Sequence, residues 1–200
     1  MNFQVNSKHE IADIKRRIVE SAEHAKIHLG LTEEDIEKLR LEAAKVKPHL
    51  HGVAERATDQ LLRDPEALAV VEKAGLTRER AVALFEEWLR QLFEGDYGEE
   101  YVLRLFKAGL IHVKVGVNER LMISQMGVFA KELLPLVDEK DALVKALSWN
   151  LAVMVYSYNY IKHVVFRDTI GVKKSLMERL FDMTTEELIG KLSDHARVKA

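Results

Sequence analysis

The chain has 200 residues, a formal net charge of −2 and 48% hydrophobic residues, which suits one globular domain with a full core. It contains no cysteine, so disulfides, thiolate catalysis, iron–sulfur clusters and cysteine zinc sites are excluded. The near-neutral charge provides no basic surface for nucleic acid, and the longest apolar run, residues 151–156, is far shorter than the roughly 20 residues that cross a bilayer. The first residues carry no secretory signal, so we expect a cytoplasmic protein that binds neither nucleic acid nor membrane.

Nearly every segment carries apolar residues at helical spacing, which predicts an all-α protein. The first expected helix covers about residues 8–27. Thr32 begins a capping sequence for the second helix, Pro48 fits the first turn of a third, and Asp64 opens a short fourth. Thr77 is the expected cap of the fifth helix. The apolar stripe of the fifth helix consists of Ala81, Leu84, Phe85, Trp88 and Leu92.

The second half of the chain continues the helical pattern. A sixth helix is expected to begin near Gly98, followed by helices over about 118–134 and 141–169. Two short helices are expected after them, over 173–181 and 185–196. The inward stripe of the sixth helix consists of Tyr101, Leu105, Ala108, His112 and Val115.

His112 is the polar member of that apolar stripe, and glycines flank it on its own face. Gly109 precedes it by three residues and Gly116 follows it by four. Each glycine costs about 1 kcal/mol relative to alanine in a helix interior, so we expect something to approach the backbone closely there. Imidazole is the commonest protein ligand of haem iron, which makes His112 a candidate ligand. The alternative is a buried core histidine with one satisfied hydrogen bond.

Four segments in a fixed order support the first interpretation. Residues 109–117 read glycine, two residues, histidine, three residues, glycine and an aliphatic residue. Upstream stand Leu-Phe-Glu-Gly-Asp-Tyr at 92–97, Leu-Leu-Arg-Asp-Pro-Glu at 61–66, and a helix start at 29–39. Together these segments resemble the sensor globins, the group that includes globin-coupled sensors, single-domain sensor globins and protoglobins. The resemblance extends over about residues 8–165.

The resemblance implies a globin fold of about eight helices within one domain, residues 1–200. The globin core would cover about 30–170, with an extra N-terminal helix at about 8–27 and a C-terminal helical extension at about 172–196. It also implies a homodimer formed through the helices at about 118–134 and 141–169.

The resemblance further implies one haem b, with His112 as the proximal ligand of the iron, and binding of O2, CO or NO for sensing or signalling. The cofactor-binding residues that we expect beside His112 are Thr58, Ala81 and Leu84 on the distal side, and Leu105, Val117 and Met122 on the proximal side.

The distal side departs from the family pattern. Family members often have Phe-Tyr, with a tyrosine that hydrogen-bonds bound oxygen, where this chain has Ala57-Thr58. A second distal polar position is occupied by Leu84. A charge-assisted hydrogen bond of this kind is worth roughly 1.5–3 kcal/mol. With only Thr58 present, we expect oxygen to be held weakly, whereas CO or NO should depend less on the change.

Two alternatives stay open at this point. The first is a haem-free globin that serves as a signalling or interaction module, as some globin domains in stress signalling do. The second is a haem enzyme that acts on NO or nitrite. The missing polar group weakens the second alternative, because general acid–base help needs a donor within reach. We therefore expect a sensor and not an enzyme.

Overall fold

The computed structural model describes residues 8–198, and side chains over residues 11–167, 170–173 and 175–191. Within this part of the chain every regular element is a helix, which confirms the all-α prediction. The chain forms two compact units, Met1–Tyr158 and Asn159–Ala200, which we call the N-terminal unit and the C-terminal unit. The single-domain organisation expected from the sequence stays a prediction.

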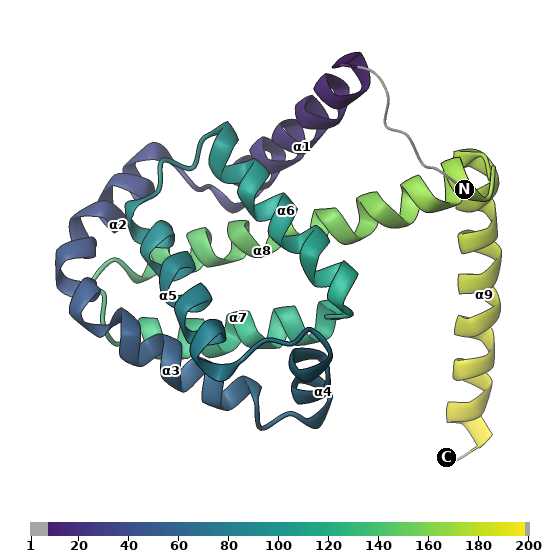
Figure 1. Ribbon diagram of the computed structural model, residues 1–200. Coiled ribbons are helices and arrows are strands. Elements are labelled where there is room, and N and C mark those ends of the chain that lie inside the picture. Colours follow the sequence, from purple (N-terminus) through teal and green to yellow (C-terminus); the bar gives the residue numbers. More distant parts are fainter. Residues whose placement is uncertain (1–7, 199–200) are drawn as a thin grey trace. The chain divides into compact units, whose positions relative to one another are not determined.

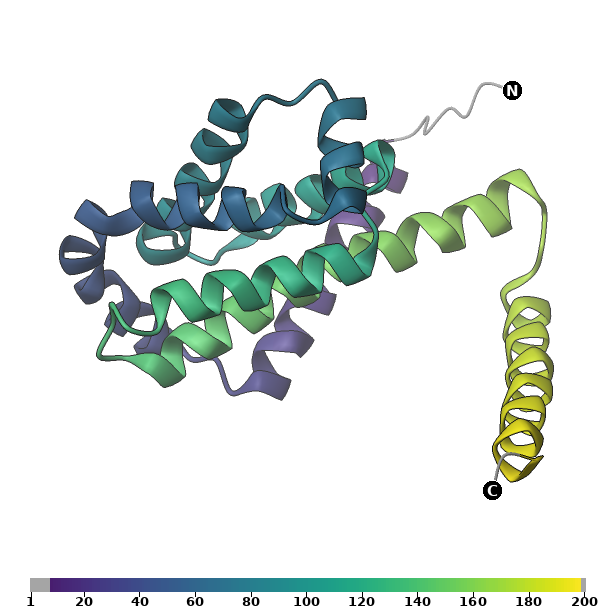
Figure 2. The same cartoon turned by 90° about the horizontal axis from the view of Figure 1, so that it is seen from below.

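Short connections join the helices of the N-terminal unit (Figure 1). In chain order they are α1 (Lys8–Leu29), α2 (Glu33–Val46), the 3-10 turn η1 (Lys47–His49), α3 (Leu50–Leu61), α4 (Pro65–Lys73), α5 (Arg78–Glu94), α6 (Glu99–Val115), α7 (Glu119–Leu133) and α8 (Lys140–Val164). The last residues of α8 belong to the C-terminal unit. Helix α3 packs against α5 and α7, and α1 packs against α6; Figure 2 shows α3 alongside α7.

Local capping signals position the starts of these helices. The Thr32 hydroxyl accepts a hydrogen bond from the Asp35 amide at 3.2 Å, and the Asp35 carboxylate accepts one from the Thr32 amide at 2.9 Å. Thr77 caps α5 by accepting from the Arg80 amide at 3.2 Å. These caps satisfy backbone N–H groups that have no partner inside the helix. Pro48, expected in the first turn of the third helix, lies in η1 just before α3.

Stacked aromatic rings around Trp149 of α8 form the centre of the N-terminal unit. The Tyr97 ring lies 4.7 Å from the Tyr101 ring and 5.1 Å from the Trp149 ring, measured between centroids. All three residues are buried, and the Trp149 indole N–H donates to the Ala22 carbonyl at 2.8 Å. Burial of one large apolar side chain stabilises a fold by roughly 1.5–3 kcal/mol. The stack therefore joins α1, α6 and α8 around the residues that precede His112.

The C-terminal unit contains the end of α8, a π-helical turn η2 (Val165–Thr169) and α9 (Lys174–Val198). The expectation of two short helices in this region is wrong, because α9 is continuous. The proposed break fell beside Thr184 and Thr185, whose β-branched side chains cost at most about 0.7 kcal/mol each in a helix. Without a proline, that cost is too small to interrupt the helix. The helix expected over 141–169 is α-helical only as far as Val164, and the π-helical turn η2 follows it.

Candidate functional site

His112 lies near the C-terminal end of α6, and its imidazole ring is largely removed from water. The Nδ1 atom is buried and has no hydrogen-bond partner among the described residues. Burial lowers the pKa of His112 below its ordinary value of 6.5, so the imidazole is neutral at neutral pH. A histidine that serves only packing normally has its buried nitrogens satisfied. A neutral imidazole with an unused ring nitrogen is the form that binds metals.

The close approach to the backbone that the sequence predicts at the glycines beside His112 is confirmed at Gly109, where the neighbour is α8, but not at Gly116. A Cβ atom at Gly109 would lie 2.6 Å from the Met154 carbonyl oxygen of α8 and closer still to the Ser157 hydroxyl. Gly109 is therefore required by the close crossing of α6 and α8. Gly116 has φ +91°, a left-handed conformation that ends α6. Neither glycine is therefore evidence for a bound haem.

Helix α8 also holds α6 on the other side of His112. The Tyr158 hydroxyl donates to the Val117 carbonyl at 3.0 Å, and the Val117 amide donates to the His112 carbonyl at 2.9 Å. With the crossing at Gly109, α6 is fixed to α8 both before and after His112. The two α8 residues involved, Ser157 and Tyr158, are consecutive. The position of His112 therefore depends on α8 more than the sequence indicated.

The residues expected on the distal side differ in their surroundings. Thr58 is fully buried on α3, and its hydroxyl donates to the Ala54 carbonyl of its own helix at 2.8 Å. Ala81 is buried in the first turn of α5, whereas Leu84, almost one turn later, is 45% exposed. Leu84 therefore does not close the distal side of the expected haem site against water. The single hydroxyl proton of Thr58 is already used, so Thr58 has no donor left for a ligand.

The residues expected on the proximal side are mostly buried. Leu105 lies two turns before His112 on α6, and Met122 lies in the first turn of α7; both are 5% exposed. Val117 follows α6 directly and is half-buried. The side chains of all three are apolar, as the contact surface of a haem requires.

The structure adds two polar residues that the sequence analysis missed. Gln125 of α7 is half-buried, and its side-chain amide donates to the Ala57 carbonyl at 3.1 Å, next to Thr58. Asn150 of α8 is fully buried, and its Oδ1 atom accepts from the Trp88 indole at 3.2 Å and from the Tyr101 hydroxyl at 2.9 Å. The sequence did carry a signal for Asn150, because its amide side chain stands between the apolar residues Trp149 and Leu151.

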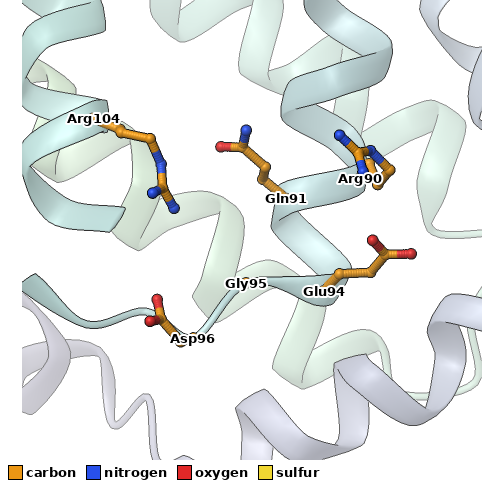
Figure 3. A pocket seen from close by; sticks show the side chains of 6 residues that line it. All are labelled: Arg90, Gln91, Glu94, Gly95, Asp96 and Arg104. Carbon is orange, nitrogen blue, oxygen red and sulfur yellow. The ribbon is translucent and has the colours of Figure 1, made fainter. Parts of the chain in front are cut away.

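A cavity of about 430 Å³ lies at the other end of α6 and is distinct from the surroundings of His112. Figure 3 shows Arg104 of α6 on one side and Arg90 and Gln91 of α5 on the other. The cavity is lined by Arg90, Gln91, Glu94, Gly95, Asp96 and Arg104. Arg104 precedes His112 by eight residues, about 12 Å along a helix. The polar walls do not suit the apolar body of a macrocycle.

The described residues fit haem better than a bare metal ion at His112. Nowhere in the described part of the chain do three His, Asp or Glu side chains come together in a way that could hold a metal ion. His112 therefore suits a metal that brings its other ligands with it, as haem iron does in its porphyrin. The neutral imidazole of His112 and the apolar side chains of Leu105 and Met122 agree with that requirement.

The sequence model of the family described as Protoglobin matches residues 20–155, a range that contains His112 and every other expected site residue. The chain belongs to the protoglobin family. Among solved structures, this protoglobin is similar to the globin domain of the Geobacter sulfurreducens globin-coupled sensor, with 27% identity and a TM-score of 0.62 over 68% of this chain and 96% of that chain. The globin fold expected from the sequence is thus confirmed. A search of curated proteins found no match.

A membrane-spanning segment is not found among the described residues of the protoglobin. None of the helices there combines the length and the hydrophobicity that crossing a bilayer requires.

Proposed function

We propose that this protoglobin binds one haem b through His112 and uses it to bind a diatomic gas as a sensor. The observation that carries the proposal is the half-buried, neutral imidazole of His112, whose buried Nδ1 atom has no partner among the described residues. The family assignment supports it. Haem, when bound, supplies an iron centre that takes up O2, CO or NO reversibly.

The residues around His112 would bind and orient the haem. Leu105, Val117 and Met122 offer apolar contact on the proximal side, and Thr58, Ala81 and Leu84 are the proposed distal residues. Burial keeps the His112 imidazole unprotonated, so no proton has to leave before it binds a metal. The contacts of α8 at Gly109 and Val117 would hold the imidazole in place.

The distal side would give a gas ligand little help from hydrogen bonding. The Thr58 hydroxyl donates to Ala54, and the Gln125 amide, which has a second N–H, already uses one N–H on Ala57. Loss of a charge-assisted bond of roughly 1.5–3 kcal/mol lowers affinity by roughly ten- to a hundredfold. We therefore infer weak retention of O2 and less altered binding of CO and NO. The small number of free donors favours sensing over enzymatic chemistry on NO or nitrite.

A sensor of this type needs an output, and we infer that a homodimer provides it. Ile123 of α7 is 51% exposed and Val144 of α8 is 46% exposed, which supports an interface through these two helices. The cysteine-free sequence suits the reducing cytoplasm as its location.

A visible absorption spectrum of the purified protein after addition of haem tests the proposal. We expect a Soret band in the wild-type protein, its loss in His112→Ala, and its retention in His163→Ala, a control at an exposed histidine of α8. The absence of a Soret band in the wild-type protein would leave the haem-free signalling module as the function of this globin. Retention of the band in His112→Ala would show that His112 is not needed to bind haem.

A further inference from the structure

Asn150 lies in the middle of α8 with its whole side chain buried. Its Oδ1 atom accepts two hydrogen bonds, from Trp88 Nε1 at 3.2 Å and from the Tyr101 hydroxyl at 2.9 Å. Its Nδ2 atom donates to the Ala146 carbonyl at 2.8 Å. Because a carbonyl oxygen has two lone pairs, both acceptor sites of the carboxamide are used.

The two donors come from the two helices that would enclose a haem. Trp88 lies on α5, one turn after Leu84 on the stripe expected to be distal. Tyr101 lies on α6, on the stripe that leads through Leu105 to His112. One oxygen atom of α8 therefore joins the proposed distal helix to the proposed proximal helix.

Ring contacts fix the orientation of both donors. Trp88 packs against Phe129 of α7 at 4.8 Å, and Tyr101 stacks on Tyr97 at 4.7 Å, centroid to centroid. Neither ring can turn without losing this packing. A buried carboxamide in an apolar helix destabilises a fold unless its partners are in place, so the two donors that meet its Oδ1 atom favour one arrangement of the helices around it.

We propose that Asn150 is a positioning residue of the haem site, because its Oδ1 atom holds α5 and α6 at a fixed separation. The inference rests on the proposed function, since it concerns how firmly the pocket retains haem. Removal of the acceptor takes away the shared hydrogen-bond partner of Trp88, which is half-buried, and of Tyr101, which is buried, so α5 and α6 lose their connection through α8. The gap between the two helices should loosen as a result.

The rate at which haem leaves the full-length protein tests this inference. Haem-loaded protein is mixed with excess apomyoglobin, and the transfer is followed through the Soret band. Asn150→Leu keeps a branched side chain of similar shape but removes the acceptor, and we expect haem loss to be faster by about tenfold, because the hydrogen bonds to both Trp88 and Tyr101 are lost. Trp88→Phe removes only one donor, disturbs the fold less, and should give a smaller acceleration.

Trp149→Phe is the matched control. It removes a buried hydrogen bond from the neighbouring residue of the same helix, but the partner of that bond is Ala22 of α1. We expect this variant to be destabilised, to lose haem at nearly the wild-type rate and to keep the wild-type haem spectrum, whereas the spectrum of Asn150→Leu should shift. Equal rates and spectra in the Asn150, Trp88 and Trp149 variants would overturn the inference while the proposed function stands. A wild-type protein that takes up no haem would overturn both.

Discussion

Gly109→Ala should destabilise the protein, although alanine is ordinarily the better helix residue. The added Cβ atom would lie 2.6 Å from the Met154 carbonyl oxygen. Ser157 can rotate its hydroxyl away, but the Met154 carbonyl is part of the α8 backbone and cannot move alone. Helices α6 and α8 would have to separate by about 0.8 Å to reach an ordinary contact of about 3.4 Å.

The size of the effect follows from two opposing contributions. Overpacking of this kind costs about 1–3 kcal/mol, and the gain in helix propensity from glycine to alanine is about 1 kcal/mol. Because three atoms of α8 would lie closer to the added Cβ atom than van der Waals contact, the upper end of the first range applies. The expected net loss is therefore about 2 kcal/mol, which shifts the midpoint of urea unfolding by about 1 M at a slope of about 2 kcal/mol/M.

Urea unfolding followed by tryptophan fluorescence measures this loss, since Trp88 and Trp149, the two tryptophans of the chain, lie in the N-terminal unit. Gly127→Ala is the matched control. Gly127 lies within α7, and a Cβ atom there would meet nothing within 4 Å. We expect this variant to gain about 0.5–1 kcal/mol. If Gly109→Ala gains stability as Gly127→Ala does, the close crossing of α6 and α8 is refuted.

Three further predictions concern the surroundings of His112. Tyr158→Phe removes the hydrogen bond to Val117 and should lower the free energy of unfolding by about 0.5–1.5 kcal/mol in the same assay; an unchanged midpoint would show that this bond contributes nothing. The pKa of His112 is lower in the folded protein than its ordinary value of 6.5, so the unfolded chain binds more protons and the haem-free protein should lose stability as the pH falls below about 6.5. His112→Gln should remove this loss of stability at low pH. Glu86 raises the pKa of His51, so His51→Gln should instead remove a contribution that stabilises the protein at low pH. A stability profile of His112→Gln identical to that of the wild-type protein would contradict the lowered pKa of His112. Thr58→Val should change the O2 dissociation rate by no more than about threefold, because the hydroxyl already donates to Ala54; stopped-flow measurements that show a much larger change would reveal Thr58 as a ligand donor.

Local signals could be predicted from the sequence because their partners are close along the chain. The caps at Thr32 and Thr77 connect residues three positions apart, and the stripe that contains His112 repeats within one helix. The contacts that give the site its rigidity are of another kind. Gly109 meets Ser157, and Asn150 meets Trp88 from 62 positions away. Such pairings depend on how whole helices cross, which the pattern of a single helix does not contain.

The same distinction explains why the sequence could not say what lies beside the glycines. A glycine in a helix indicates that something comes close, but not what it is. At Gly109 the neighbour is α8, and at Gly116 the requirement is the positive φ that ends α6. Thr58 was likewise expected as the remaining distal donor, and only its three-dimensional surroundings show that Ala54 already accepts its proton.

The central claim, that His112 is the haem ligand, is tested most directly by the iron–imidazole stretching vibration of the ferrous protein in resonance Raman spectra. We predict that the wild-type protein shows this band, that His112→Gly lacks it, and that added imidazole restores it by entering the space left by the side chain. Persistence of the band in His112→Gly without imidazole would mean that another residue binds the iron and would contradict the account.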